Sequence, residues 1–103
     1  MPLHLLPDDP LQEAELCWQQ GQPRRALSLL YRGAVRELRL PEQTTEQENL
    51  ALVQKNEDAR TLQAFQVIML AWQAQAWAGR TPPAFAPLAA AYRQRFLRRS
   101  ASA

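Results

Sequence analysis

Prolines and glycines divide the chain into segments whose apolar residues have helical spacing. The 103 residues include eight prolines, which fall between the periodic segments or at their starts, and only three glycines. A proline inside a helix removes a backbone hydrogen bond and clashes with the preceding turn, so helices are expected between these positions. No segment shows the strict alternation of apolar and polar residues that is typical of a strand. The sequence therefore predicts an all-α fold, a compact bundle of about five helices over residues 10–20, 23–39, 45–54, 58–78 and 86–98.

Capping residues indicate where several of these helices begin and end. Asp9 can accept hydrogen bonds from free amides at the start of the first helix, and Pro10 suits its first turn. Gly21 can adopt the left-handed conformation that closes a helix. Thr45 and Glu48 have the spacing of a capping box, in which each side chain accepts from the backbone amide of the other. These signals predict short, defined connections.

Length and composition are those of one globular domain covering residues 1–103. Apolar residues make up 47% of the chain and charged residues 21%, which is unlike the composition of a disordered segment. A chain of this length can bury one modest core. The lone Cys17 cannot form an internal disulfide, so a reducing compartment is the simpler expectation.

The fourth predicted helix is apolar on most sides. Residues 61–79 carry no formal charge but contain four glutamines, which favours a buried helix of a soluble domain over a membrane span. One apolar stripe consists of Leu62, Phe65, Met69, Trp72 and Ala76, and a second of Val67, Leu70, Ala74 and Trp77. Such a helix is usually central, so we expect neighbours to pack on both of its flanks.

Residues that could support catalysis or metal binding are scarce. The chain has one histidine, His4, and one cysteine, Cys17, which do not make a zinc site or a nucleophile with its base. The adjacent carboxylates fall at predicted helix starts, where they stabilise the helix dipole. The sequence therefore predicts a protein that is not an enzyme, with no cofactor and no metal site.

The charges are unevenly distributed along the chain. Residues 1–58 hold six basic and ten acidic groups, a net −4, whereas residues 59–103 hold six basic groups and no acidic group, a net +6. The second predicted helix also carries a stripe of arginines on the side opposite its apolar residues. The stripe consists of Arg25, Arg32, Arg36 and Arg39.

This arginine stripe allows several interpretations. It can be an ordinary solvated face, a docking face for a protein partner, or a surface that binds anionic lipid or nucleic acid. The C-terminal arginines Arg93, Arg95, Arg98 and Arg99 could extend the surface. Nucleic acid is less favoured, because the aromatic residues fall on predicted core stripes rather than between the arginines.

Trp77 is a second candidate for partner binding. It falls on a different flank of the fourth helix from Trp72, and burial in the core is expected for both. An exposed tryptophan would instead mark a partner-binding groove, because tryptophan is enriched at interaction hot spots.

The N-terminal part of the chain resembles one tetratricopeptide repeat. The segment "AELCWQQGQPRRALSLLY" has the order of helix, glycine, turn and helix. No second copy follows at the period of about thirty-four residues, which excludes an array. A helical hairpin of this kind is expected at the N-terminal end.

A broader resemblance covers residues 6–97. The motifs are "LPDDPLQEAELCWQQGQPRRALSLLYRGAVREL", the helix start "TEQE" and the aromatic-rich "FQVIMLAWQAQAWAGRTPP". In this order they resemble a family of bacterial domains known as domain of unknown function 4129. The segment "TEQEN" lacks a glycine that some relatives carry after Thr-Glu, which affects a turn.

The family resemblance implies a cellular setting. In that family the domain follows a transmembrane helix as a cytoplasmic tail, including at the end of transglutaminase-like membrane proteins, and its genes lie near those of MoxR-type ATPases. The resemblance therefore implies a non-catalytic interaction or regulatory module, the soluble cytoplasmic part of an inner-membrane protein. It transfers no catalytic residue to this chain.

Overall fold

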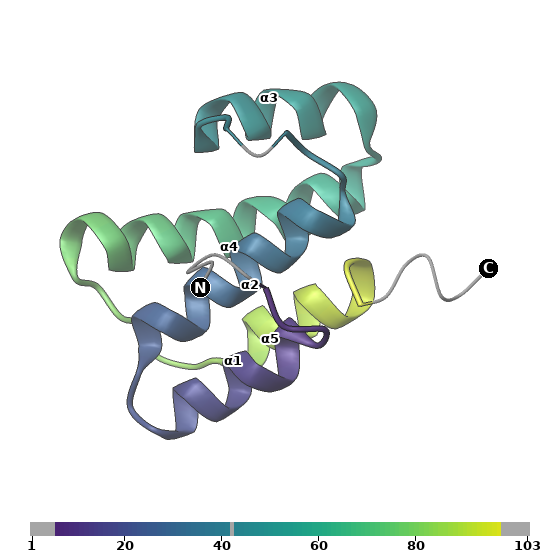
Figure 1. The fold of residues 1–103 in the computed structure, drawn as a ribbon. Coiled ribbons are helices and arrows are strands. Elements are labelled where there is room, and N and C mark those ends of the chain that lie inside the picture. Colours follow the sequence, from purple (N-terminus) through teal and green to yellow (C-terminus); the bar gives the residue numbers. More distant parts are fainter. Residues whose placement is uncertain (1–5, 42, 98–103) are drawn as a thin grey trace.

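Five α-helices form the described part of the protein. The computed structural model describes residues 6–41 and 43–97, and within these ranges it contains no strand (Figure 1). The helices are α1 (Pro10–Gln19), α2 (Pro23–Glu37), α3 (Glu46–Asn56), α4 (Ala59–Ala78) and α5 (Ala86–Arg95). The predicted all-α bundle is confirmed. The largest differences from the predicted bounds are at the helix ends: α2 ends at Glu37 instead of residue 39, α3 at Asn56 instead of 54, and α5 at Arg95 instead of 98.

The first two helices form the expected hairpin. The Asp9 carboxylate accepts a hydrogen bond of 3.2 Å from the backbone amide of Gln12 at the start of α1. Gly21 closes the turn in the left-handed conformation at a φ of 75°. The backbone amide of Gln22 then bonds to the carbonyl of Cys17 at 2.8 Å. These local bonds reverse the chain, and α1 and α2 pack along each other.

The core lies where α2, α4 and α5 meet, and α1 and α3 close it from either side. Full burial of a large apolar side chain stabilises the fold by about 1.5–3 kcal/mol relative to exposure. The largest fully buried side chains are Tyr92, Phe65, Phe96, Leu27, Leu30, Ile68 and Val53. Every helix except α1 contributes to this set, so the helices depend on one another for their stability.

Neighbours pack against α4 as expected, since α2, α3 and α5 all contact it, but they do not cover its second apolar stripe. Its first stripe faces the core, where Phe65 and Met69 are buried, but its second stripe faces solvent. Leu70 is 59% exposed and Trp77 is 80% exposed. The reason is length, because α3 has 11 residues against the 20 of α4 and folds back from the start of α4 (Figure 1). It therefore ends before the last turns of α4.

The three helices α1, α2 and α5 approach closely at Gly33. A Cβ atom at this position would lie 3.1 Å from the Cβ of Pro10 and would overlap the Tyr92 hydroxyl. Tyr92 is 1% exposed and lies against Phe96, with 5.8 Å between the ring centroids, so it has little room to move. The absence of a side chain at residue 33 is therefore required by packing.

We expect Gly33→Ala to destabilise the protein. The steric cost of about 1–3 kcal/mol should outweigh the gain of up to about 1 kcal/mol in helix propensity. Urea unfolding followed by circular dichroism measures the change. In a Tyr92→Phe background the substitution should cost less, because the overlapping hydroxyl is gone. An alanine variant as stable as the native chain would contradict the close packing.

Burial of Tyr92 makes stability sensitive to alkaline pH. Desolvation raises the pKa of Tyr92 to about 12, from an ordinary value near 10, while Arg36 opposes the shift. Above about pH 10 the unfolded chain ionises this phenol while the folded chain keeps it protonated. The free energy of unfolding should then fall by up to about 1.4 kcal/mol per pH unit. In Tyr92→Phe the loss between pH 10 and 12 should be smaller, as measured by urea unfolding at each pH.

Candidate binding groove

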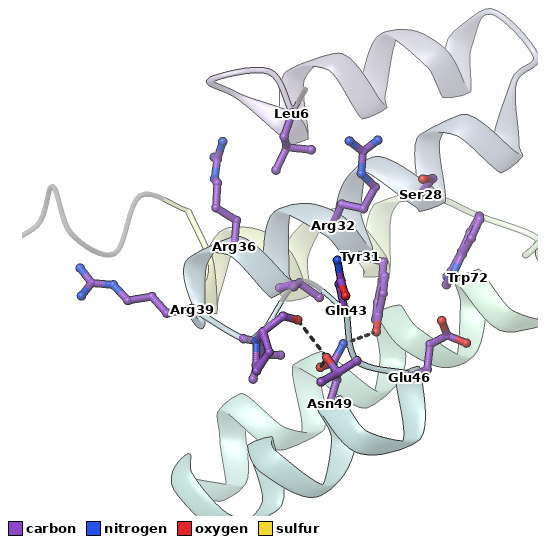
Figure 2. Close-up of a pocket in the computed structure, with 14 residues that line it drawn as sticks. Leu6, Ser28, Tyr31, Arg32, Arg36, Arg39, Gln43, Glu46, Asn49 and Trp72 are labelled. Atoms are coloured by element: carbon purple, nitrogen blue, oxygen red, sulfur yellow. Dashed lines mark hydrogen bonds between the residues drawn. The ribbon is translucent and has the colours of Figure 1, made fainter. Parts of the chain in front are cut away.

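A cleft lies beside α2 and opens between that helix, the α2–α3 connection and the start of α3. Its volume is about 910 Å³. The lining includes Leu6 of the N-terminal segment, Asn49 of α3 and Trp72 of α4, with Trp72 toward one end and Arg39 at the other (Figure 2). Four segments far apart in the sequence therefore form one concave surface.

A second cleft of about 550 Å³ continues the first toward the start of α2. Ser28 and Trp72 line both clefts, so the two are adjacent. We refer to the two together as the α2 groove. The groove follows α2 along its length, which is about 22 Å for 15 residues.

The predicted arginine stripe lies along the α2 groove. Arg32, Arg36 and Arg39 line the larger cleft and Arg25 lines the smaller one. Arg24, which the sequence did not single out, joins Arg25 in the smaller cleft. Five cations therefore lie along one shallow groove, and all of them except Arg32 are also exposed to solvent.

Two of these arginines, Arg36 and Arg39, are placed differently from the prediction. Arg39 lies beyond the end of α2 and adopts a left-handed backbone conformation, with a φ of 55°. Its side chain points away from those of Arg32 and Arg36 (Figure 2). Arg36 donates hydrogen bonds to the backbone carbonyls of Pro7 at 3.0 Å and Asp8 at 3.4 Å. Arg36 therefore holds the N-terminal segment against α2, in addition to lining the groove.

A buried polar network fixes the wall that α3 contributes to the groove. The Asn49 side chain is 3% exposed, and its Nδ2 donates to the Tyr31 hydroxyl at 2.9 Å. The Thr44 hydroxyl bonds to the Asn49 Oδ1 and lies 2.9 Å from the carbonyl of Pro41 (Figure 2). Burial raises the pKa of Tyr31, so its hydroxyl stays neutral at physiological pH. The start of α3 is thereby tied to α2.

The start of α3 also has the predicted capping box. The backbone amide of Thr45 donates to the Glu48 carboxylate at 2.8 Å, and the amide of Glu48 donates to the Thr45 hydroxyl at 3.1 Å. This reciprocal pair ends the α2–α3 connection at a defined position. Glu46, one residue further, lines the groove as an acidic group opposite the arginines.

The tryptophans are placed differently from the prediction. Trp72 packs against the core as predicted, but it is only half-buried and also lines the groove beside the arginines. Trp77 is exposed instead of buried, and it lines neither cleft. The sequence showed both apolar stripes of α4, but which stripe is buried and which flank borders a cleft depends on how the neighbouring helices pack.

Of the C-terminal arginines, the two that the structure describes do not extend the groove. Arg93 forms an ion pair of 3.9 Å with Glu15 of α1, and neither it nor Arg95 lines either cleft. Arg95 lies near Asp58, whose pKa is lowered mainly by the backbone hydrogen bond from Thr61 and in smaller part by this arginine. Arg98, Arg99 and His4 lie outside the described residues.

Residues 6–41 and 43–97 contain no group of three His, Cys, Asp or Glu side chains placed to hold a metal ion, and Cys17 is buried at 5% exposure. In the same ranges no helix has both the length and the apolar character needed to cross a membrane. Comparison with protein-family models, curated proteins and solved structures gives no match to this chain.

The polar network gives a direct test of the groove wall. We expect Asn49→Ala to lower the free energy of unfolding by about 1–3 kcal/mol, because the buried Tyr31 hydroxyl loses its donor. Thermal and urea unfolding measure the loss. Gln54→Ala, at an exposed position of the same helix, should change stability by less than about 0.5 kcal/mol. Equal effects of the two substitutions would show that the network does not hold α3.

Proposed function

We propose that this chain is a non-catalytic helical interaction module that binds an acidic segment of a partner protein in the α2 groove. The observation that carries the proposal is the gathering of Arg24, Arg25, Arg32 and Arg39 along one concave surface. Arginine pairs with carboxylates through two parallel hydrogen bonds, which gives direction as well as attraction. A groove of this kind suits a peptide segment.

The dimensions of the groove define the partner segment. A length of about 22 Å accommodates about four turns of helix. Arg25 and Arg32 are seven residues apart on α2, which is about two turns, while Arg39 lies beyond the end of the helix. A helical segment with acidic residues at the same spacing, and an apolar residue to meet Trp72, would match the groove in charge and shape. Trp72 supplies the apolar contact at the junction of the two clefts.

The resemblance to domain of unknown function 4129 supports a place for this module in the cell. We propose that it serves as the cytoplasmic part of a bacterial inner-membrane protein. The partner would be another protein near the membrane, and components of a MoxR-type ATPase system are the first to examine. Trp72 and the α3 wall lie beside the arginines in the groove, and this combination favours a shaped peptide segment over a flat lipid surface.

Charge reversal on the groove tests this function. We expect Arg25→Glu combined with Arg39→Glu to weaken binding of a fluorescent acidic helical peptide by at least about tenfold, measured by anisotropy. Both side chains are exposed, and Arg36 is left unchanged because it holds the N-terminal segment. The matched control is Arg60→Glu combined with Arg80→Glu, two exposed arginines that line neither cleft. Equal weakening by both pairs would indicate attraction to net charge alone and would contradict a groove site.

Single-stranded nucleic acid is the second candidate ligand, and the position of Trp72 favours it. A half-buried tryptophan among arginines can stack on a base while the cations contact phosphates. Tyr31 also lines the groove, but its ring is buried at 8% exposure. Trp72 is therefore the aromatic side chain available for stacking among the described lining residues. Tighter binding of an oligonucleotide than of the acidic peptide, with a steep decrease in affinity as salt rises, would favour this candidate.

A further inference from the structure

An exposed apolar ridge runs along α4 on a different flank from the one that borders the α2 groove. The ridge consists of Val67, Leu70, Ala74 and Trp77, whose spacing of three, four and three residues places them on one side of the helix. Val67 is 40% exposed, Leu70 59% and Trp77 80%. Scattered apolar residues are ordinary on a surface, but a contiguous row that includes a tryptophan is typical of a contact site.

The ridge has no charge along its length. Residues 61–79 contain no Asp, Glu, Lys or Arg, and the polar residues beside the ridge are glutamines, including the exposed Gln63 and the half-buried Gln66 and Gln73. A glutamine amide both donates and accepts, so it can pair with the same group on another copy. A partner recognised by charge would find its complement only at the two ends of α4, at Arg60 and Arg80.

The order of side chain sizes along the ridge is self-complementary. In an antiparallel pair of α4 helices with a two-fold axis midway between Leu70 and Ala74, each Leu70 faces the Ala74 of the other copy. Each Trp77 then faces Val67. A large side chain therefore meets a smaller one at every position, as packing of two helices requires. An isologous interface needs this match of a surface with itself.

We propose that a second copy of this chain covers the α4 ridge, with the two α4 helices antiparallel about an axis between Leu70 and Ala74. The apolar surface of the ridge is roughly 400 Å² per copy, so the pair would bury about 800 Å² in total. Stable complexes bury more, about 1,200–2,000 Å². The dimer is therefore weak, with a dissociation constant of roughly 0.1–1 mM. It leaves the α2 groove of each copy open.

The salt dependence of association distinguishes this dimer from binding that is driven by charge. The ridge contributes no ion pair to the contact, and each copy carries the same net charge of +2. The repulsion between like copies is strongest at low ionic strength and is screened at high ionic strength, where the Debye length falls to a few ångströms. Association should therefore strengthen as salt rises. An acidic partner or an anionic lipid surface would dissociate instead.

Sedimentation equilibrium of the full chain, from about 10 µM to about 2 mM, tests the proposal. We expect the average mass to rise toward that of a dimer, more so at high salt. Leu70→Glu should weaken association at least about tenfold, because it places two carboxylates near the axis. Leu16→Glu is the matched control at a 44% exposed leucine of α1, and it should leave association unchanged. Circular dichroism verifies that both variants fold.

Several results would overturn the proposal. One is a native chain that stays monomeric at about 2 mM in high salt. Another is an association that Leu16→Glu weakens as much as Leu70→Glu does. If the chain stayed monomeric and instead bound an acidic peptide or vesicles of anionic lipid, and Leu70→Glu abolished that binding, the ridge would belong to that ligand. If Leu70→Glu fails to fold, the association of Leu70→Gln and the salt dependence of association of the native chain test the proposal instead.

Discussion

The packing of α2 against α4 determines both candidate surfaces of this protein. Leu27 and Leu30 of α2 are fully buried, as are Phe65 and Ile68 of α4, so each helix has one orientation that buries its apolar residues. With α2 oriented in this way, its arginines border the flank of α4 that carries Trp72. The same packing leaves the second apolar stripe of α4 exposed at Val67, Leu70 and Trp77. One contact thus produces a basic groove and an apolar ridge.

The short α3 gives the groove its defined shape. Its start is tied to α2 through the Asn49–Tyr31 hydrogen bond, and its capping box sets where the α2–α3 connection ends. A buried polar pair of this kind is costly to leave unsatisfied, so it favours a single arrangement of the wall. The same helix is too short to cover the last turns of α4. The position and length of α3 are therefore a second cause of both the groove and the exposed ridge.

Local signals in the sequence predicted the helices, and tertiary contacts decided the sites. Asp9 and the pair Thr45 and Glu48 cap their helices as predicted, because each cap involves residues three positions apart. The position of Trp72 beside the arginines could not be read from spacing, since it depends on how α2 packs across α4. For the same reason the exposure of Trp77 was predicted wrongly, and the bonds from Arg36 to the N-terminal segment were not anticipated.

The central claim is that the α2 groove binds an acidic segment, and the indole signals of the tryptophans test it most directly. Trp72 lines the groove, Trp77 lies on the exposed ridge and Trp18 stacks on Phe85 with 5.2 Å between the ring centroids. We would titrate an acidic helical peptide into ¹⁵N-labelled protein and follow the indole N–H resonances. The account predicts a saturable shift of the Trp72 signal with little change at Trp18 and Trp77. A shift confined to Trp77, or no shift at saturating peptide, would contradict it.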